Sequence, residues 1–356
     1  MLALQKQGMC VLVAGDGGDG YEARIRALGI PFVRIPVDRR ALNPAADIRL
    51  LRHLVRWYRA ERPDVVHHFT IKPVIYGSLA ARIARVPRII NTVTGLGFAF
   101  SPDAPSWLRA LVERQYAVAL RGAHFTFFQN RDDYQLFVDR RLVSPKKAGI
   151  LPGSGVDTEH FSPGAPESEA RQEQTVCFLM VARLLRDKGV YEFVSAARRI
   201  LENGSPARFL LLGGRDERNP RVLPLADLQA WQKEGVIAWL GEVVDVRPAL
   251  RQADVVVLPS YYLEGIPRSL LEAAAMAKPV ITTNSVGCRE AVIDGVTGLL
   301  VPPRDTDALT LAMQRLVSTP DLRRSMGDAG RTRMVREFDE KQVIASILET
   351  YPGGRQ

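Results

Sequence analysis

The sequence is poor in cysteine and in long apolar runs, and each shortage excludes a class of protein. Its 356 residues include three cysteines, Cys10, Cys177 and Cys288, which lie far apart and lack C-x-x-C spacing. This argues against a disulfide framework and a structural zinc, and we expect all three to be small buried apolar residues in a reducing compartment. No apolar run approaches the roughly 20 residues that span a bilayer. No basic and apolar leader opens the chain, so the cytoplasm is the expected location.

Positive charge is concentrated in the first part of the chain. Residues 1–150 contain 23 Lys and Arg against 12 Asp and Glu, a net charge of +11, whereas residues 151–356 contain 25 against 27, a net charge of −2. Within residues 47–64, apolar residues recur at helical spacing and five arginines occupy other positions. Such a helix is either a solvated surface or a binding face for an anionic partner. We favour an anionic membrane surface over nucleic acid, because no recognition-helix, zinc-finger or RNP signature accompanies the charge.

Short apolar runs alternate with helix-length segments, a pattern typical of βαβ units and parallel sheets. The predicted strands are CVLVAG, FVRIPV, DVVHHFT, RIINTVTG, HFTFFQN and AGILPGSG, then TVCFLMVA, ARFLLLGG, VIAWLG, DVVVLPS, KPVITTN and TGLLVPP. A connector rich in Pro, Gly, Ser and Glu, residues 155–174, separates the two series. We therefore predict an α/β chain of two Rossmann-like doubly wound domains that face a cleft. The predicted bounds are 1–165 and 166–337, with a C-terminal helix, 338–356, packing back toward the first domain.

The start of the chain carries a nearly complete dinucleotide fingerprint. Gly15, Gly17 and Gly20 follow an apolar run with G-x-G-x-x-G spacing, and Asp38 lies at the distance of a ribose-binding acid. An NAD(P)-dependent oxidoreductase would use these residues. However, the chain opens on what resembles the end of a helix and a second strand, so we expect the first strand and its loop to be absent. Carboxylates within the fingerprint would also oppose a diphosphate, and we favour a simple turn.

Residues 259–281, PSYYLEGIPRSLLEAAAMAKPVI, carry the strongest chemical signal. Glu264 follows a buried strand, Pro267 is expected at the first helical position, and Glu272 about two turns into the helix. Free N–H groups at residues 268–270 would then bind phosphate. Glu264 could accept hydrogen bonds from sugar hydroxyls, and Glu272 from two ribose hydroxyls. The alternative is that both glutamates merely favour the helix dipole or lie on a solvated surface.

Two further stretches place charged or glycine residues at strand ends that face the same cleft. FLMVARLLRDKGVYEF puts Arg183 and Lys188 in the turn after the first strand of the second domain. Two cations there could stabilise the charge that develops on a leaving nucleoside diphosphate, although surface charges are the simpler reading. VGCREAVIDGVTGLLVP adds Gly287, Glu290 and Gly298.

Together these three motifs resemble the donor-binding signature of the retaining glycosyltransferases of family 4, which have the two-domain B-type fold. LNP at 42–44, TVTGLG at 92–97 and LLGGRDERNP at 211–220 are similar to bacterial enzymes that extend polyprenyl-diphosphate-linked saccharides. The resemblance implies a retaining, metal-independent transfer of a sugar from a UDP-sugar donor, with no cofactor. It implies an N-acetylhexosamine such as GalNAc, and an acceptor at the inner face of the cell membrane, where the protein would be peripheral.

The resemblance also implies roles for individual residues. Arg183 and Lys188 would bind the diphosphate, and Glu264 the donor sugar. The remaining predicted donor contacts are the backbone of Gly265, Ile266, Pro267 and Arg268 with the phosphates, Glu272 with the ribose, and the segment containing Gly241 and Val243 with the base. Many relatives carry a histidine after the fourth strand of the first domain, whereas this chain has Thr94 and Gly95, so no catalytic histidine is transferred.

The acceptor side is predicted from the first domain, where the candidates are His68, Lys72, Thr94 and Gly95. His67 and His68 end a strand without a third metal ligand, and we expect one imidazole to face the core and the other the cleft. The D-x-D pattern at 305–307 precedes a helix, and an N-cap explains it better than a metal site. The alternatives left open are a glycosyltransferase with a soluble acceptor, the oxidoreductase, and a nonenzymatic membrane-binding protein.

Overall fold

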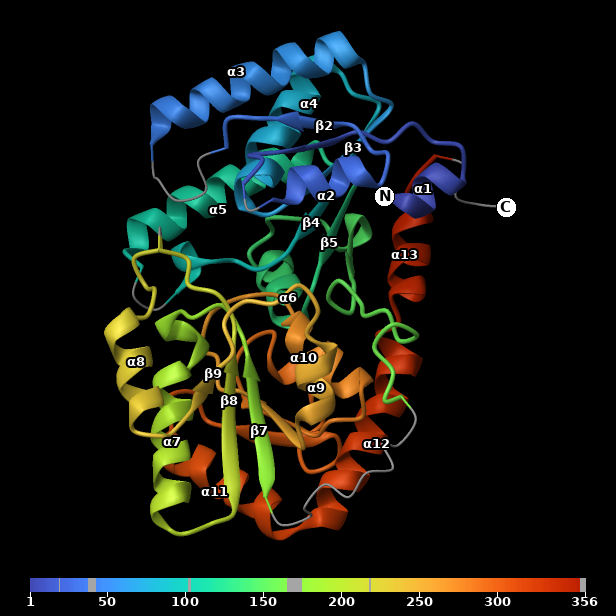
Figure 1. The fold of residues 1–356 in the computed structure, drawn as a ribbon. Coiled ribbons are helices and arrows are strands. Elements are labelled where there is room, and N and C mark those ends of the chain that lie inside the picture. Colours follow the sequence, from blue (N-terminus) through green and yellow to red (C-terminus); the bar gives the residue numbers. More distant parts are fainter. Residues whose placement is uncertain (19, 38–42, 102–103, 165–174, 218, 353–356) are drawn as a thin grey trace. The chain divides into compact units, whose positions relative to one another are not determined.

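The computed structural model describes residues 1–356 except 19, 38–42, 102–103, 165–174, 218 and 353–356 (Figure 1). The chain divides into two compact units. Unit 1 comprises Met1–Leu151 and Ile344–Gln356, and unit 2 comprises Pro152–Val343. The boundaries predicted from the sequence were residues 165 and 338.

The described residues of unit 1 form two separate parallel sheets. The strands β1 (Val13–Gly15) and β2 (Phe32–Arg34) pair with each other, and β3 (Val65–Phe69), β4 (Arg88–Val93), β5 (Phe125–Phe128) and β6 (Ala148–Ile150) form a second sheet in that order. The helical segments are α1 (Leu2–Lys6), α2 (Tyr21–Ala27), α3 (Pro44–Glu61), η1 (Pro73–Gly77), α4 (Ser78–Ala84), η2 (Phe98–Phe100), α5 (Ser106–Arg121), α6 (Arg131–Asp139) and η3 (Pro145–Lys147).

The arginine-rich helix α3 shows how local sequence sets an element of unit 1. Asn43 caps it, since its side-chain oxygen accepts from the N–H groups of Ala45 and Ala46, and Pro44 occupies the first turn. Its buried side chains are those of Leu50, Leu54 and Tyr58. Because they recur every four residues, one face packs inward and leaves the arginines outside.

In the part of unit 2 that the structure describes, the strands form a six-stranded parallel sheet with the order β12-β11-β10-β7-β8-β9. Its strands are β7 (Val176–Val181), β8 (Ala207–Leu212), β9 (Ala238–Trp239), β10 (Val255–Leu258), β11 (Val280–Thr283) and β12 (Gly298–Val301). The helical segments are η4 (Arg186–Lys188), α7 (Val190–Glu202), α8 (Leu225–Lys233), α9 (Arg247–Gln252), α10 (Arg268–Ala275), η5 (Arg289–Ala291), α11 (Thr306–Ser318) and α12 (Pro320–Glu337); α13 (Glu340–Leu348) crosses into unit 1.

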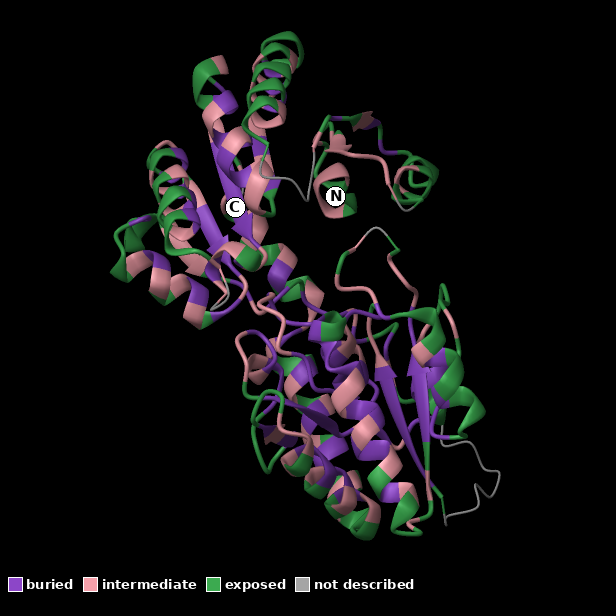
Figure 2. Ribbon diagram, turned by 90° about the vertical axis from the view of Figure 1, so that its left-hand side faces the viewer, coloured by how far each residue is buried: buried purple, intermediate pink, exposed green. Residues whose placement is uncertain are grey.

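The strands of unit 2 form its core because helices cover both faces of a parallel sheet. Every residue of β10 is buried, as are five of the six in β7. Figure 2 shows buried residues along strands of both units, among them β4 and β5 of unit 1 and β7 and β10 of unit 2, and mixed burial along the helices. Each of the twelve predicted runs contains a strand, so the α/β prediction is confirmed.

One expectation about the cysteines is wrong. Cys177 and Cys288 are buried as predicted, but Cys10 is exposed. It follows α1, a helix of five residues that buries none of its side chains, so no core is available there to cover the thiol.

Candidate functional site

The candidate site of unit 2 lies at the carboxyl ends of β7 and β10. From β7 the chain adds β8 and β9 on one side, and then returns to add β10, β11 and β12 on the other. Ligands of open parallel sheets bind where the strand order reverses in this way, because the loops after the two central strands diverge. The loops after β7 and β10 contain Lys188 and Glu264, respectively.

A glycine allows these two loops to touch. Gly189 has a φ of +80°, and a Cβ atom at this position would lie 2.2 Å from the carbonyl oxygen of Pro259. Any other residue would therefore separate the turn after β7 from the loop after β10. The close approach buries the neighbouring Lys188, which is 6% exposed.

The structure brings together two residues that lie 76 positions apart in the sequence. The Lys188 ammonium forms an ion pair with the Glu264 carboxylate, whose side chain is 21% exposed. The ring of Tyr262 lies 5.4 Å from Lys188 Nζ and covers the cation. A cation and a carboxylate are thus held side by side at the end of the sheet, where one can bind phosphate and the other hydroxyl groups.

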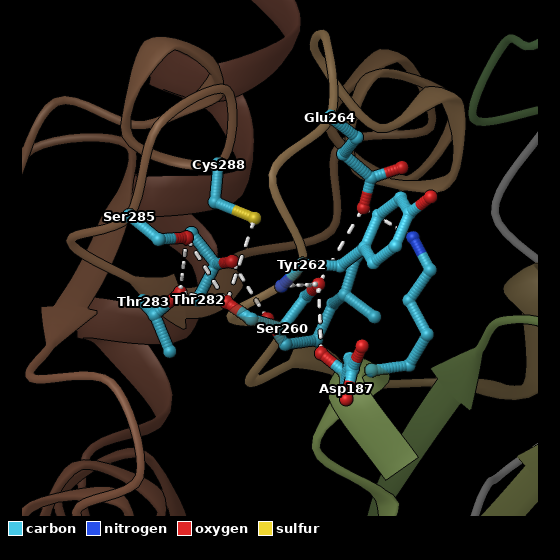
Figure 3. A network of polar contacts seen from close by, with 10 residues as sticks. Asp187, Ser260, Tyr262, Glu264, Thr282, Thr283, Ser285 and Cys288 are labelled. Carbon is cyan, nitrogen blue, oxygen red and sulfur yellow. Dashed lines mark hydrogen bonds and ion pairs between the residues drawn. The ribbon is translucent and has the colours of Figure 1, made fainter. Parts of the chain in front are cut away.

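Ser260 connects these loops, and the sequence interpretation missed it. Its hydroxyl lies 3.3 Å from the carbonyl oxygen of Asp187 and 3.4 Å from Glu264 Oε1, so it can donate to either (Figure 3). The Ser260 carbonyl in turn accepts from the hydroxyls of Thr283 and Ser285. Ser260 and Ser285 follow the buried strands β10 and β11, and Thr283 is the last residue of β11; that position was the signal that could have identified them.

The start of α10 differs from the predicted geometry. Pro267 is the N-cap with extended backbone (ψ 124°), so Arg268, not Pro267, is the first helical residue. The Leu270 N–H donates to the Pro267 carbonyl at 3.1 Å and is not free for phosphate. A tightened first turn of this kind leaves the N–H groups of Arg268 and Ser269 as the remaining candidates.

Glu272 lies in the middle of α10 and is largely covered. Its side chain is 14% exposed, and its carboxylate accepts from Arg268 Nε at 3.3 Å. Burial raises the pKa of the Glu272 carboxyl, and the Arg268 guanidinium opposes that rise. Next to this helix the side chain of Ile266 belongs to the unit 2 core, so only its backbone could contact a donor.

Two more loops complete this edge of the sheet. Gly287 has a φ of +82°, and a Cβ atom there would lie 2.5 Å from the carbonyl oxygen of Glu264 and 2.3 Å from that of Gly265. On the other side, the Gly213 N–H donates to the Gly241 carbonyl at 2.8 Å, which ties the predicted base-binding segment to the end of β8. In that segment Val243 is 39% exposed.

The remaining predicted diphosphate ligand, Arg183, lies at the beginning of the turn after β7. Its side chain is exposed. A second ion pair in the same region joins Arg221 to Asp187, the residue that precedes Lys188. Lys188 therefore shares the turn after β7 with the exposed Arg183 and with Asp187, which is paired with Arg221.

In unit 1 both histidines of β3 are engaged in hydrogen bonds. His68 is 6% exposed; its Nε2 lies 3.0 Å from the Tyr58 hydroxyl and its Nδ1 3.0 Å from Asn91 Oδ1. Burial lowers the pKa of His68 to about 4 and that of His67 to about 3. His67 forms a hydrogen bond with the hydroxyl of Tyr351, which holds the C-terminal segment of unit 1 next to β3. His68 thus lies in the interior and not at an open surface.

The other acceptor-side candidates divide between a half-buried ion pair and a strand end. Lys72 Nζ lies 2.8 Å from Asp47 Oδ1, and the Tyr76 hydroxyl donates to the second carboxylate oxygen at 2.9 Å. Thr94 and Gly95 directly follow β4, at its carboxyl end. Of these candidates, Thr94 and Gly95 are placed where parallel sheets bind ligands.

The glycine fingerprint lies in the two-stranded sheet of unit 1. Gly15 ends β1 and Gly20 precedes α2, but the N–H of Gly18 donates to the side chain of Asp16 at 3.3 Å. The N–H of Gly18, inside the fingerprint loop, is thus directed at a carboxylate. Asp38, the expected ribose ligand, lies outside the described residues.

The D-x-D pattern is a helix cap, as predicted, since Asp305 accepts from the N–H of Ala308 at 2.8 Å. Within the described part of the chain, no group of three or more His, Cys, Asp or Glu side chains could hold a metal ion. None of the described helices combines the length and hydropathy of a membrane-spanning segment.

Comparisons with known proteins assign both parts of the chain to similar families. Residues 163–333 match the family described as "Glycosyl transferases group 1", and residues 1–127 match "Glycosyl transferase 4-like". The N,N'-diacetylbacillosaminyl-diphospho-undecaprenol alpha-1,3-N-acetylgalactosaminyltransferase of Campylobacter jejuni is 27% identical, over 94% of this chain and 88% of its own. The UDP-Gal:alpha-D-GlcNAc-diphosphoundecaprenol alpha-1,3-galactosyltransferase of Escherichia coli is 26% identical, over 95% and 86%.

Solved structures share the fold. Alr3699/HepE of Anabaena, crystallised with UDP, aligns with a TM-score of 0.76 and 18% identity over 95% of this chain and 91% of its own. A glycosyltransferase from Rickettsia africae aligns with a TM-score of 0.75 and 18% identity, over 99% and 92%.

Proposed function

This chain belongs to the glycosyltransferases and has their two-domain GT-B fold, and from that premise we propose that it transfers a sugar from a UDP-sugar to a polyprenyl-diphosphate-linked saccharide. The observation that carries the proposal is the pairing of Lys188 with Glu264 where the strand order of unit 2 reverses. A nucleoside diphosphate sugar presents one group for each: phosphate for the cation and hydroxyls for the carboxylate.

In the proposed reaction the acceptor hydroxyl attacks the anomeric carbon from the face that the diphosphate leaves. The bond between that carbon and the diphosphate oxygen breaks, a bond to the acceptor oxygen forms, and the proton passes to the departing phosphate. The configuration is retained without a protein nucleophile. Lys188 and Arg183 offset the negative charge that develops on the leaving group, and Glu264 orients the sugar.

The donor site in this proposal uses backbone as well as side chains. The residues from Gly265 to Arg268 contact the phosphates, Glu272 accepts from the ribose hydroxyls, and the stretch from Gly241 to Val243 lies against uracil. In the free protein the ammonium of Lys188 contacts Glu264. Donor binding replaces this ion pair with two separate contacts, one from Lys188 to the phosphate and one from Glu264 to the sugar hydroxyls. Because breaking the ion pair leaves both side chains without their partner, the donor must supply the phosphate and the hydroxyls together.

The names of the relatives support a lipid-linked acceptor, because two of the similar proteins are described as acting on undecaprenyl-diphosphate-linked sugars. One transfers N-acetylgalactosamine and the other galactose, and we propose an N-acetylhexosamine donor. The +11 net charge of residues 1–150 would attract an anionic membrane, so the protein would work as a peripheral protein at its inner face.

Transfer to a water-soluble short-chain prenyl-diphosphate-linked sugar tests the reaction without a membrane. We expect Glu264→Gln and Lys188→Met each to lower kcat/KM by about a hundredfold, the usual effect of removing one transition-state contact. Glu234→Gln is the matched control, because Glu234 is an exposed glutamate of unit 2 paired with Arg198. Thermal unfolding of each variant verifies that it is folded.

The same assay decides the finer points. NMR of the product should show the donor's anomeric configuration, and EDTA should leave the rate unchanged. Inversion would overturn the retaining mechanism, and loss of activity with EDTA would overturn metal independence. Transfer to free saccharides but not to the prenyl-linked one would favour the soluble-acceptor alternative.

A further inference from the structure

The outer face of α5 is apolar where a helix exposed to water is normally polar. Its inner face packs against the core through Leu108, Val112, Tyr116, Ala119 and Leu120. On the opposite face Trp107 is 63% exposed, Leu111 46% and Val118 41%. Trp107 and Leu111 are four residues apart, and Leu111 and Val118 are seven residues apart, so the three share one side of the helix.

The charges on this face have one sign. The exposed charged residues described in α5 are Arg114 and Arg121. The acidic residue, Glu113, is 15% exposed and accepts from Arg109 at 3.1 Å and Arg140 at 3.0 Å. The outward side of α5 thus combines apolar groups with cations.

The helix α3 has a similar division. Its first-turn acid, Asp47, is bound to Lys72 and Tyr76, and among its described exposed residues only the last, Glu61, is acidic. Arg52 and Arg56 point outward with the rest of the arginine row.

Both helices contact the η1–α4 segment of unit 1. Helix α5 also begins after β4, whose carboxyl end carries Thr94 and Gly95. The exposed Trp107 therefore lies at the end of α5 nearest the proposed acceptor side.

We propose that α5 is an interfacial helix that inserts Trp107, Leu111 and Val118 into an anionic bilayer. Arg114 and Arg121 extend to the headgroup phosphates, and the α3 arginines add a second cationic row. A second copy of the chain fits this face less well, because a twofold contact would set arginines against arginines. The inference rests on the proposed lipid-linked acceptor and adds that a hydrophobic anchor, and not charge alone, holds the protein at the membrane.

Vesicle sedimentation with phosphatidylcholine, alone or mixed with phosphatidylglycerol, tests the proposal. We expect the Trp107→Ser/Leu111→Ser variant to bind mixed vesicles about tenfold more weakly than the unchanged protein, since insertion scales with buried apolar area. Leu311→Ser is the matched control, because Leu311 is 66% exposed on a helix of unit 2. Brominated acyl chains should quench tryptophan fluorescence, and Trp107→Phe should remove most of that quenching while binding persists.

Three outcomes would overturn the inference. Unchanged binding by the double variant would mean that charge alone holds the protein. Quenching that survives Trp107→Phe would place the insertion elsewhere. A dimer detected by light scattering that the double variant abolishes would make this face a contact between copies. Transfer to the water-soluble acceptor should be normal in the double variant. If the proposed function were wrong, the unchanged protein would also fail to transfer sugar to this acceptor, so the two failures can be told apart.

Discussion

At the scale of single residues, Glu272 links burial to donor binding. Burial raises the pKa of this carboxyl, so it takes up a proton at a higher pH than an ordinary glutamate. If the carboxylate binds the ribose, affinity for uridine should be full near pH 8 and fall as the pH drops through the raised pKa. Glu272→Gln should bind uridine about tenfold more weakly, the loss of one charge-assisted hydrogen bond, without this pH dependence.

Calorimetric titration with uridine between pH 5 and 8 measures this effect, because uridine has no phosphate that titrates in that range. Glu234→Gln, which changes an exposed glutamate of the same unit, should behave like the unchanged protein. If Glu272→Gln showed the same pH profile as the unchanged protein, the Glu272 carboxylate would not be the ribose ligand.

Sequence reasoning proposed candidate residues but not the contacts between them. It selected Lys188 and Glu264 from separate motifs, but their ion pair depends on the contact of two loops far apart in the chain. It did not use Ser260, because a serine after a buried strand is compatible with solvent as well as with an internal hydrogen bond. For His67 and His68 the sequence could not say which imidazole faces the core, because a strand alternates its faces and the partner that covers each face belongs to other segments.

At the scale of elements, the loop between β11 and η5 supports the backbone of the Glu264 loop. Gly287→Ala should incur the penalty of a positive φ, about 1–2 kcal/mol, and should also push the peptide of residues 264–265 away from the new methyl group. We expect its kcat/KM to fall at least about tenfold, equivalent to about 1.4 kcal/mol in the barrier, because Glu264 is displaced.

Gly295→Ala is the control for this change. Gly295 has a φ of +73°, but no atom lies within 4 Å of the Cβ position, so the substitution adds strain without a clash. Both variants should show a lower urea midpoint, and only Gly287→Ala should lose transfer activity. Equal activity in the two would mean that the loop after β11 does not position Glu264.

A helix or strand could be predicted from the sequence where its hydrophobic periodicity fitted only one type of element and one buried face. The twelve strand segments followed from short apolar runs bounded by glycine, proline and polar residues. In contrast, α5 has apolar residues on nearly every side, so its period could not show which face is buried. Only the packing of Leu108, Val112 and Tyr116 reveals that Trp107 and Leu111 are left outside.

At the scale of the whole molecule, the division into two units predicts that donor binding stabilises one of them. UDP at about 100 times its dissociation constant should add roughly 2.7 kcal/mol to the free energy of opening the unit that binds it. Hydrogen exchange of amides in β7 and β10 should then slow by about a hundredfold where exchange requires that opening, whereas β4 and β5 of unit 1 should exchange as before.

Mass spectrometry of peptic fragments resolves the two units without a substitution, and NAD at the same concentration is the control ligand. A nucleotide site at the strand-order reversal of unit 2 requires protection by UDP and none by NAD. Protection of α2 and the preceding glycine loop by NAD would instead support the oxidoreductase alternative. Equal protection of both units by UDP would show that they open as one cooperative body, so that binding energy from unit 2 also stabilises the part of the chain proposed to hold the acceptor.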